Sequence, residues 1–163
     1  MKVLLTLLVA IPLAAHGHDP KHHGNSRPAS ADPSSDYVVK LEEMTAIEAG
    51  KGEKIHLLRG NEHGFKNLSF ILTETAPGGG PPLHSHESEE AHVLTAGTMS
   101  YVIGDQTFVV SAPYILRVPA NTPHTFINAG ATPLALTAVF DSAEYTFKPI
   151  ADNPLQKTEG ATP

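Results

Sequence analysis

The sequence predicts an all-β protein with a single sandwich or barrel domain. From Tyr37 onward, short runs rich in Val, Ile, Thr, Phe and Tyr follow one another, and turn residues such as Gly104-Asp105 separate them. No segment shows apolar residues at helical spacing over a helical length. At 163 residues, the chain is long enough for one domain with a substantial core.

Each expected strand is a run of β-prone residues that ends at a turn. In chain order the runs cover residues 37–44, 54–58, 67–75, 90–96, 98–103, 106–110, 114–118, 123–128, 134–140 and 144–148. The breaks between them include Gly50-Lys51-Gly52, Gly60-Asn61, Gly78-Gly79-Gly80, Ala120-Asn121 and Asn128-Ala129-Gly130. We find no internal repeat, so these strands belong to one domain.

Residues 1–17 have the composition of a secretory signal peptide. Basic Lys2 precedes an apolar run from Val3 to Ala15, which is too short to span a membrane. Cleavage after Gly17 would place small residues at both positions that a signal peptidase recognises, and cleavage after Ala15 is the alternative. A buried first strand or helix is the competing interpretation of the run. We expect a secreted or periplasmic protein with no membrane insertion after cleavage.

The composition divides the remaining chain into three parts. Residues 18–36 are polar and rich in Pro and His, which predicts a disordered linker. Residues 37–150 carry the β-prone runs and form the predicted domain, and residues 151–163 form a flexible C-terminal tail. The linker histidines would bind metal weakly at best, and a solvated linker explains them equally well.

Charge and cysteine content exclude several functions. The chain has no cysteine, so neither disulfides nor thiol catalysis are available to it. Without Lys2, ten basic residues face 17 acidic ones, a net charge of about −7 with His neutral. Because Lys and Arg form no cluster, we expect neither nucleic acid nor an anionic membrane surface as a partner.

Three histidines and a glutamate form the pattern with the clearest chemistry. His84 and His86 are two residues apart, so on a strand both imidazoles project from one face. Glu90 follows at the start of the next strand, and His124 comes just after a turn. Glu89 would replace Glu90 if the intervening turn were one residue shorter. Brought together, these side chains would bind one divalent transition metal.

The residues do not select the metal. Imidazole and carboxylate ligands suit Fe, Mn, Ni, Cu or Zn alike. Four protein ligands on an octahedral ion would leave two positions open to substrate or dioxygen. On Zn(II), the same four ligands would complete a closed tetrahedral structural site.

These residues lie in a pattern that resembles the two conserved motifs of the cupin superfamily. The first motif, G-x5-H-x-H-x3-E-x6-G, is matched by Gly78, His84, His86, Glu90 and Gly97. The second, G-x5-P-x-G-x2-H-x3-N, is matched at Pro119, His124 and Asn128. The resemblance covers about residues 37–148. Within the superfamily, the chain is similar to the quercetin-dioxygenase-like group of small single-domain cupins.

The resemblance implies a fold and a ligand set. The fold is a single jelly-roll-like antiparallel β-barrel with a metal in its mouth, and the implied ligands are His84, His86, Glu90 and His124. Pro113 and Asn121 replace glycines of the second motif. Asn tolerates the left-handed conformation of a tight turn, whereas Pro does not, so the turn before strand 114–118 must be built differently.

Further candidate site residues follow from strand parity. His92 shares the face of Glu90, where it would act as a partner of the metal site, a substrate-binding group or a general base. A buried histidine bonded to a neighbour explains it as well. We predict catalytic roles for Glu90 and His92, and a substrate pocket lined by His92, Met99, Tyr101 and Phe126.

The functional prediction is an exported, metal-dependent, dioxygenase-like oxidoreductase that acts on a small phenolic or enolisable substrate. Glu90 would accept the substrate proton. The alternative is a non-catalytic cupin that binds a metal or small ligand in the cell envelope. A homodimer through sheet edges is a further expectation, because exposed edges need protection.

Overall fold

The structure is a computed structural model that describes residues 36–156. The predicted signal peptide and all of the predicted linker except Asp36 lie outside the described residues. From Tyr37 onward the described chain belongs to one compact unit. Within the described part, no helix is both long enough and apolar enough to cross a membrane.

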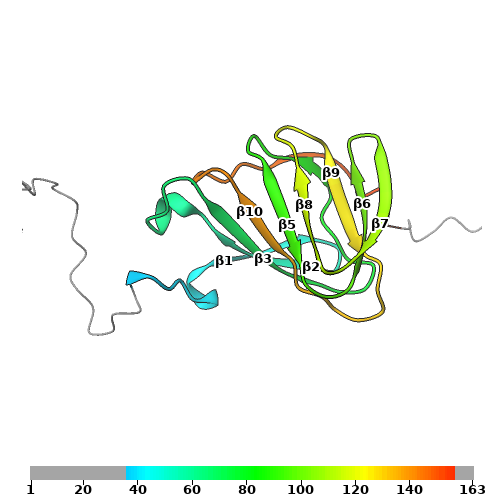
Figure 1. Cartoon of the computed structure of the whole chain (residues 1–163), viewed down its shortest axis with the longest axis horizontal. Helices are drawn as coiled ribbons and strands as arrows, with labels where there is room; N and C mark the ends of the chain where they lie inside the picture. Colours follow the sequence, from blue (N-terminus) through cyan, green and yellow to red (C-terminus); the bar gives the residue numbers. More distant parts are fainter. Residues whose placement is uncertain (1–35, 157–163) are drawn as a thin grey trace, which may run out of the picture. The chain divides into compact units, whose positions relative to one another are not determined.

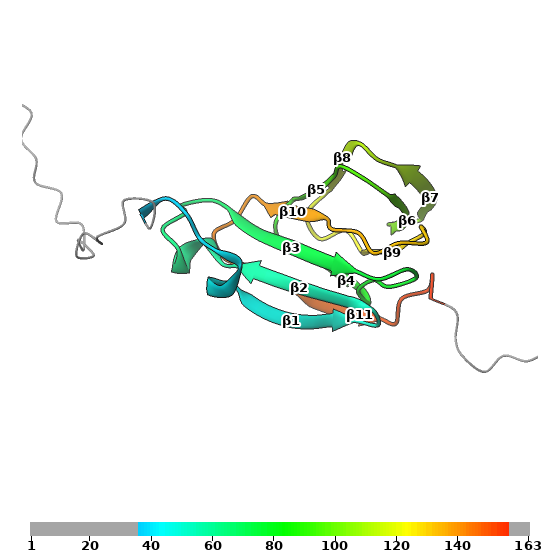
Figure 2. The ribbon, with the colours of Figure 1, turned by 90° about the horizontal axis from the view of Figure 1, so that it is seen from below.

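Two antiparallel sheets make up the described domain (Figures 1 and 2). The six-stranded sheet contains β1 (Thr45–Gly50), β2 (Glu53–Leu58), β3 (Ser69–Thr75), β10 (Thr137–Phe140), β5 (Glu90–Leu94) and β8 (Tyr114–Val118), in that spatial order. The five-stranded sheet contains β11 (Lys148–Ala151), β4 (Leu83–Ser85), β9 (His124–Asn128), β6 (Thr98–Ile103) and β7 (Gln106–Ser111). Two short 3₁₀ turns, η2 (Leu41–Glu43) and η3 (Gly60–Glu62), complete the elements.

This arrangement confirms the predicted all-β, jelly-roll-like fold. Figure 1 shows β10, β5 and β8 side by side, and Figure 2 shows β1, β2 and β3 continuing the same sheet. In the described residues, the two sheets are not joined by strand pairing into a closed barrel, so the domain is a jelly-roll sandwich.

Alternation along the strands places the core between the two sheets. On β5, Glu90, His92 and Leu94 are buried while the residues between them are partly exposed. On β6, Met99 and Tyr101 are almost completely buried. The inward parity predicted for these strands is therefore confirmed, and it follows from the two-residue repeat of a strand.

Two predicted strand positions are wrong, and one observed strand is missing from the predicted runs. Residues 37–44 form no strand, because the chain turns at η2, where the Lys40 N–H donates to the Glu43 carboxylate at 2.9 Å. The first strand is instead Thr45–Gly50. Residues 144–147 form a loop before β11. Leu83–Ser85 pairs as a strand that is missing from the predicted β-prone runs, although the spacing of His84 and His86 indicates one there.

The C-terminal boundary also differs from the prediction. Residues 157–163 lie outside the described part, but Asn153 is buried and its Nδ2 donates to the carbonyls of Pro81 and Phe126 at 2.8 and 2.9 Å. Residues as far as Asn153 therefore pack against the domain, and residues 157–163 of the predicted tail 151–163 lie outside the described residues.

Two turn residues show how the motif fits this fold. Asn121 has φ 59°, the left-handed conformation predicted for it. Gly80 packs its backbone against β9, where an added Cβ would lie 1.9 Å from the carbonyl oxygen of Phe126. Only glycine allows this approach, which brings the segment leading into β4 against β9.

Candidate metal centre

The three histidines of the two motifs meet on the inner face of the five-stranded sheet. His84 on β4 and His124 on β9 are direct cross-strand partners, and His86 follows β4. One ring nitrogen from each residue lies within 4.8 Å of the others, and all three side chains are buried. The spacing argument from sequence therefore holds for these three residues.

Backbone carbonyls fix the orientation of all three rings. Nδ1 of His84 donates to the Pro82 carbonyl and Nδ1 of His124 donates to the Thr122 carbonyl, each at 2.8 Å. Nδ1 of His86 donates to the carbonyl of Thr146. With Nδ1 as the protonated nitrogen, each Nε2 keeps its lone pair for another partner, as in metal-binding histidines.

The opposite sheet supplies the carboxylate. Glu90 at the start of β5 is 4% exposed, and its Oε2 lies 2.9 Å from Nε2 of His124 and 3.6 Å from Nε2 of His86. Glu89 is half-exposed and forms an ion pair with Arg117. The turn therefore has the length that points Glu90, and not Glu89, toward the histidines.

The contact between His124 and Glu90 suits a shared cation better than a hydrogen bond. Although 2.9 Å separates Nε2 from Oε2, the pair lacks hydrogen-bond alignment, and neither atom has another hydrogen-bond partner among the described residues. Two buried polar atoms that point to a common position without bonding each other fit a metal ligated by both. The residues present thus fit a divalent metal.

The electrostatics of the group favour the protonation states that metal binding needs. Burial, assisted by the neighbouring His124, lowers the pKa of His84 to about 3, and burial also lowers the pKa of His86. Burial alone would raise the pKa of Glu90, but His92 and His124 outweigh it and hold that pKa well below its usual value. His84 and His86 are therefore neutral at neutral pH, and Glu90 is ionised, as metal binding requires.

His92 orients the carboxylate from behind. Its Nε2 donates to Oε1 of Glu90 at 2.9 Å, and its Nδ1 accepts the hydroxyl of Tyr101 at 3.2 Å. Tyr101 in turn contacts the hydroxyl of Tyr114 at 3.0 Å. Since both ring nitrogens are engaged, this geometry suits a positioning residue for Glu90, and the catalytic role of His92 stays a prediction.

Replacing His92 with phenylalanine should therefore weaken metal binding without abolishing it. The substitution keeps an aromatic ring but removes the hydrogen bond that fixes Oε1 of Glu90. Loss of such a partner typically lowers metal affinity about 10- to 100-fold. Metal titration followed by calorimetry checks this, and Tyr114→Phe, at the far end of the chain of hydrogen bonds, is the matched control. Equal affinities in His92→Phe and wild type would contradict this role.

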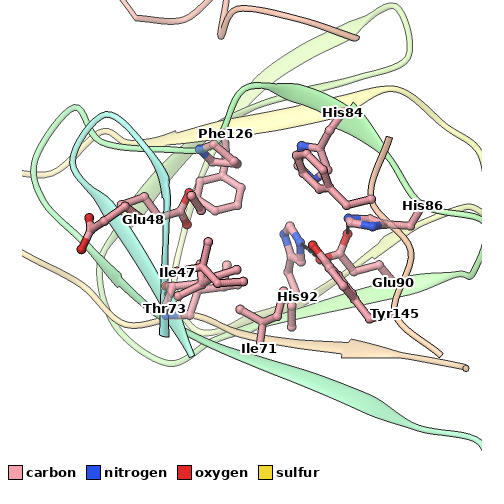
Figure 3. A pocket seen from close by; sticks show the side chains of 17 residues that line it. Ile47, Glu48, Ile71, Thr73, His84, His86, Glu90, His92, Phe126 and Tyr145 are labelled. Atoms are coloured by element: carbon pink, nitrogen blue, oxygen red, sulfur yellow. Dashed lines mark hydrogen bonds and ion pairs between the residues drawn. The ribbon is translucent and has the colours of Figure 1, made fainter. Parts of the chain in front are cut away.

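A cavity of about 280 Å³ opens beside the histidines. Figure 3 shows His84, His86, Glu90 and Tyr145 on one side of it, with Ile47, Glu48 and Thr73 on the other. Of the predicted pocket residues, His92 and Phe126 line this cavity. Met99 and Tyr101 lie in the hydrophobic core and are not among the described residues that line it.

Sequence reasoning missed the loop 142–147 as part of the site. Thr146 provides the carbonyl that orients His86, and its hydroxyl accepts the Glu87 N–H at 2.9 Å. The ring of Phe147 stacks on His84 with centroids 4.8 Å apart, and Tyr145 packs beside His86. The alternation of Tyr145 and Phe147 is the available signal, but it predicts a strand and not a loop beside the histidines.

Comparison with known proteins agrees with this geometry. Residues 71–140 match a family model described as a cupin domain. The protein has a cupin domain. The match begins in β3 and ends in β10, so it covers the three histidines, Glu90 and His92, and the resemblance found in the two motifs is confirmed.

Solved structures resemble the cupin domain in fold. Oxalate decarboxylase from Bacillus subtilis aligns with TM-score 0.61 and 23% identity over 68% of this chain and 31% of that chain. The Lactobacillus farciminis enzyme, in complex with formate, aligns with TM-score 0.59 and 24% identity over 68% and 34%. The polyketide cyclase RemF from Streptomyces resistomycificus aligns with TM-score 0.57 and 20% identity over 72% and 87%.

These likenesses establish the fold and not the activity. The alignment spans about a third of the oxalate decarboxylase chains. The Bacillus subtilis enzyme contains Mn(II) centres. No curated protein matches the chain.

Proposed function

We propose that this cupin is a metal-dependent, dioxygenase-type oxidoreductase that acts on a small phenolic or enolisable compound. One observation carries the proposal: three imidazoles and an ionised carboxylate converge beside a largely apolar cavity, whose wall includes His84, His86 and Glu90. A structural metal would need no such cavity, whereas a substrate site does. The Mn(II) centres of the Bacillus subtilis neighbour add support for a redox-active metal.

The side chains of the cavity suit this chemistry. A bound divalent metal would supply Lewis-acid and redox chemistry next to the cavity. Glu90, held ionised by His92 and His124, is placed to accept the proton of a phenol or enol. The rings of Phe126 and Phe147 line the space beside the histidines and would flank an aromatic or conjugated substrate while excluding water.

The overall reaction requires no additional reductant. In a dioxygenase reaction the substrate loses electrons to dioxygen, and both oxygen atoms end in the oxidised product. The proton removed from the substrate hydroxyl is held at Glu90 and returns to the product. Only the substrate, dioxygen and the resident metal are needed.

Oxygen uptake tests the proposal directly. Protein purified without a tag is analysed for metal and then assayed in an oxygen electrode against flavonols, catechols and diketones. We expect bound Fe, Mn, Ni or Cu and oxygen uptake with at least one class, lost in Glu90→Gln. If protein loaded with each of these metals consumes no oxygen across the panel, the enzyme proposal is wrong.

A non-catalytic role is the second candidate. Both ring nitrogens of His92 are engaged in hydrogen bonds, so His92 has no free nitrogen with which to act as a general base. Of the two predicted catalytic residues, this leaves Glu90 as the base nearest the histidines. A cupin domain that binds a metal or a small ligand in the cell envelope would have the same cavity. Tight ligand binding to metal-loaded protein without oxygen uptake would favour this role.

We also propose that the protein is exported to the periplasm or secreted. Support comes from the basic residue and apolar run of residues 2–15. N-terminal sequencing of the exported protein would distinguish cleavage after Gly17 from cleavage after Ala15. Sedimentation of the mature protein would test the expected homodimer.

A further inference from the structure

A second buried carboxyl group lies in the same cavity. Glu53, the first residue of β2, is 2% exposed and lines the cavity wall. It belongs neither to the candidate metal ligands nor to the residues that orient them. Its Oε1 lies 3.5 Å from the hydroxyl of Thr75, while Oε2 has no hydrogen-bond partner among the described residues. A buried polar atom without a partner requires a physical explanation.

Glu53 is part of a polar patch on β2 and β3. It pairs across the ladder with Thr75, whose hydroxyl also donates to Thr73 Oγ1 at 3.1 Å. In Figure 3, Thr73 and Glu48 lie across the cavity from His84 and His86. The cavity therefore has polar groups on the six-stranded sheet at β2 and β3, separate from those of the metal centre.

The wall between the two polar groups is apolar. It consists mainly of Ile47, Ile55, Ile71, Phe126, Leu136 and Ala138. No lysine or arginine is among the described residues that line the cavity, so neither is available to form an ion pair with a carboxylate of a ligand. The volume of about 280 Å³ is near the lower end for ligand pockets and suits a body of one or two rings.

Burial keeps Glu53 in its neutral form. It raises the pKa of Glu53 to about 8; the hydroxyl of Thr75 opposes this shift and the negative charge of Glu90 adds to it. At neutral pH the group therefore carries a hydroxyl hydrogen. A protonated carboxyl group in an apolar site is a strong hydrogen-bond donor to an oxygen acceptor.

We propose that Glu53 is a specificity-determining residue that donates a hydrogen bond to an oxygen acceptor on the ligand, at the end remote from the histidines. The ligand class is a small molecule with chelating oxygens at one end, an apolar body, and an uncharged carbonyl or ether oxygen at the other. Only the chelating end rests on the proposed function. Glu48 on the same side of the cavity disfavours a carboxylate at the remote end.

Matched catechols test this proposal by binding rather than turnover. Each pair has the same chelating head and differs in a tail ketone. The short pair is 4-ethylcatechol and 3′,4′-dihydroxyacetophenone; the long pair is 4-butylcatechol and 4-(3,4-dihydroxyphenyl)butan-2-one. Affinities are measured by calorimetry without oxygen, on full-length protein loaded with Ni(II). The variants are Glu53→Gln and Glu53→Leu, with Glu62→Leu on the exposed η3 turn as control.

The measured quantity is the ratio of the affinities for the ketone and the alkyl compound, compared between wild type and each variant. In at least one pair, the preference for the ketone over the alkyl compound should be about three- to tenfold greater in wild type than in Glu53→Leu. Glu53→Gln, which keeps an N–H donor, should retain part of the preference, and Glu62→Leu all of it. Glu53→Met replaces the leucine variant if thermal melting shows that the latter does not fold.

Two failures are distinguishable. If both pairs bind but show the same ketone preference in wild type and Glu53→Leu, Glu53 does not contact the ligand and the inference is wrong. If wild type binds Ni(II) but no catechol, or does not bind Ni(II) in the cavity, the proposed chelating function fails, and the inference falls with it.

Discussion

Replacing His124 with alanine is expected to lower the affinity for a divalent metal by more than about 100-fold. Losing a hydrogen-bonded partner of a ligand already costs about 10- to 100-fold, and His124 is itself a candidate ligand. The substitution removes one of the three converging nitrogens, the Nε2 of His124, which lies 2.9 Å from Oε2 of Glu90. Metal titration monitored by calorimetry, with metal content after gel filtration, measures the loss.

The control must account for histidines elsewhere in the chain. The sequence has ten histidines, and those of residues 16–23 are shared by wild type and variant. Their weak binding therefore cancels in the comparison. His63→Ala, outside the centre on the turn after η3, should retain the high-affinity site. Unchanged high-affinity binding in His124→Ala would show that the three histidines are not the metal site.

The pairing of His84 with His86 was predictable because strand geometry alone constrains it. The two-residue spacing of His84 and His86 puts both rings on one face, whatever the detailed fold. Only the match to the motif favoured Glu90 over Glu89 as the carboxylate ligand. Strand spacing could not decide between them, because the length of the turn between the two strands depends on tertiary packing. The ion pair of Glu89 with Arg117 on the neighbouring strand β8 is the contact that separates the two.

The rest of the site depended on contacts that sequence spacing does not encode. Thr146 reaches His86 from 60 residues away, and the local pattern of residues 144–148 favoured a strand. Glu53 was not singled out, because a glutamate at the start of a strand is usually solvated. Its burial arises from the packing of β2 between β1 and β3, with one face on the cavity.

Replacing Glu53 with glutamine is expected to stabilise the metal-free protein, increasingly so as the pH rises. In the folded state the pKa of Glu53 is about 8, compared with 4.5 for an unperturbed glutamate. The folded state therefore binds more protons than the unfolded state between these values, and the free energy of unfolding of the wild type falls as pH rises from about 4.5 to 8. At about 1.4 kcal/mol per pKa unit, the full loss is roughly 4–5 kcal/mol.

Glutamine cannot ionise and so avoids this loss, while its side chain has nearly the same size and can still accept the Thr75 hydroxyl. The gain over wild type should be smallest near pH 5 and reach several kcal/mol by pH 8–9, measured by denaturant unfolding in the presence of a chelator. Glu62→Gln, an exposed carboxyl, should follow the wild-type pH dependence. A constant difference between Glu53→Gln and wild type from pH 5 to 9 would mean that Glu53 ionises normally in the folded protein. Because ligand recognition by Glu53 requires the neutral acid, that outcome would also remove its role as a hydrogen-bond donor.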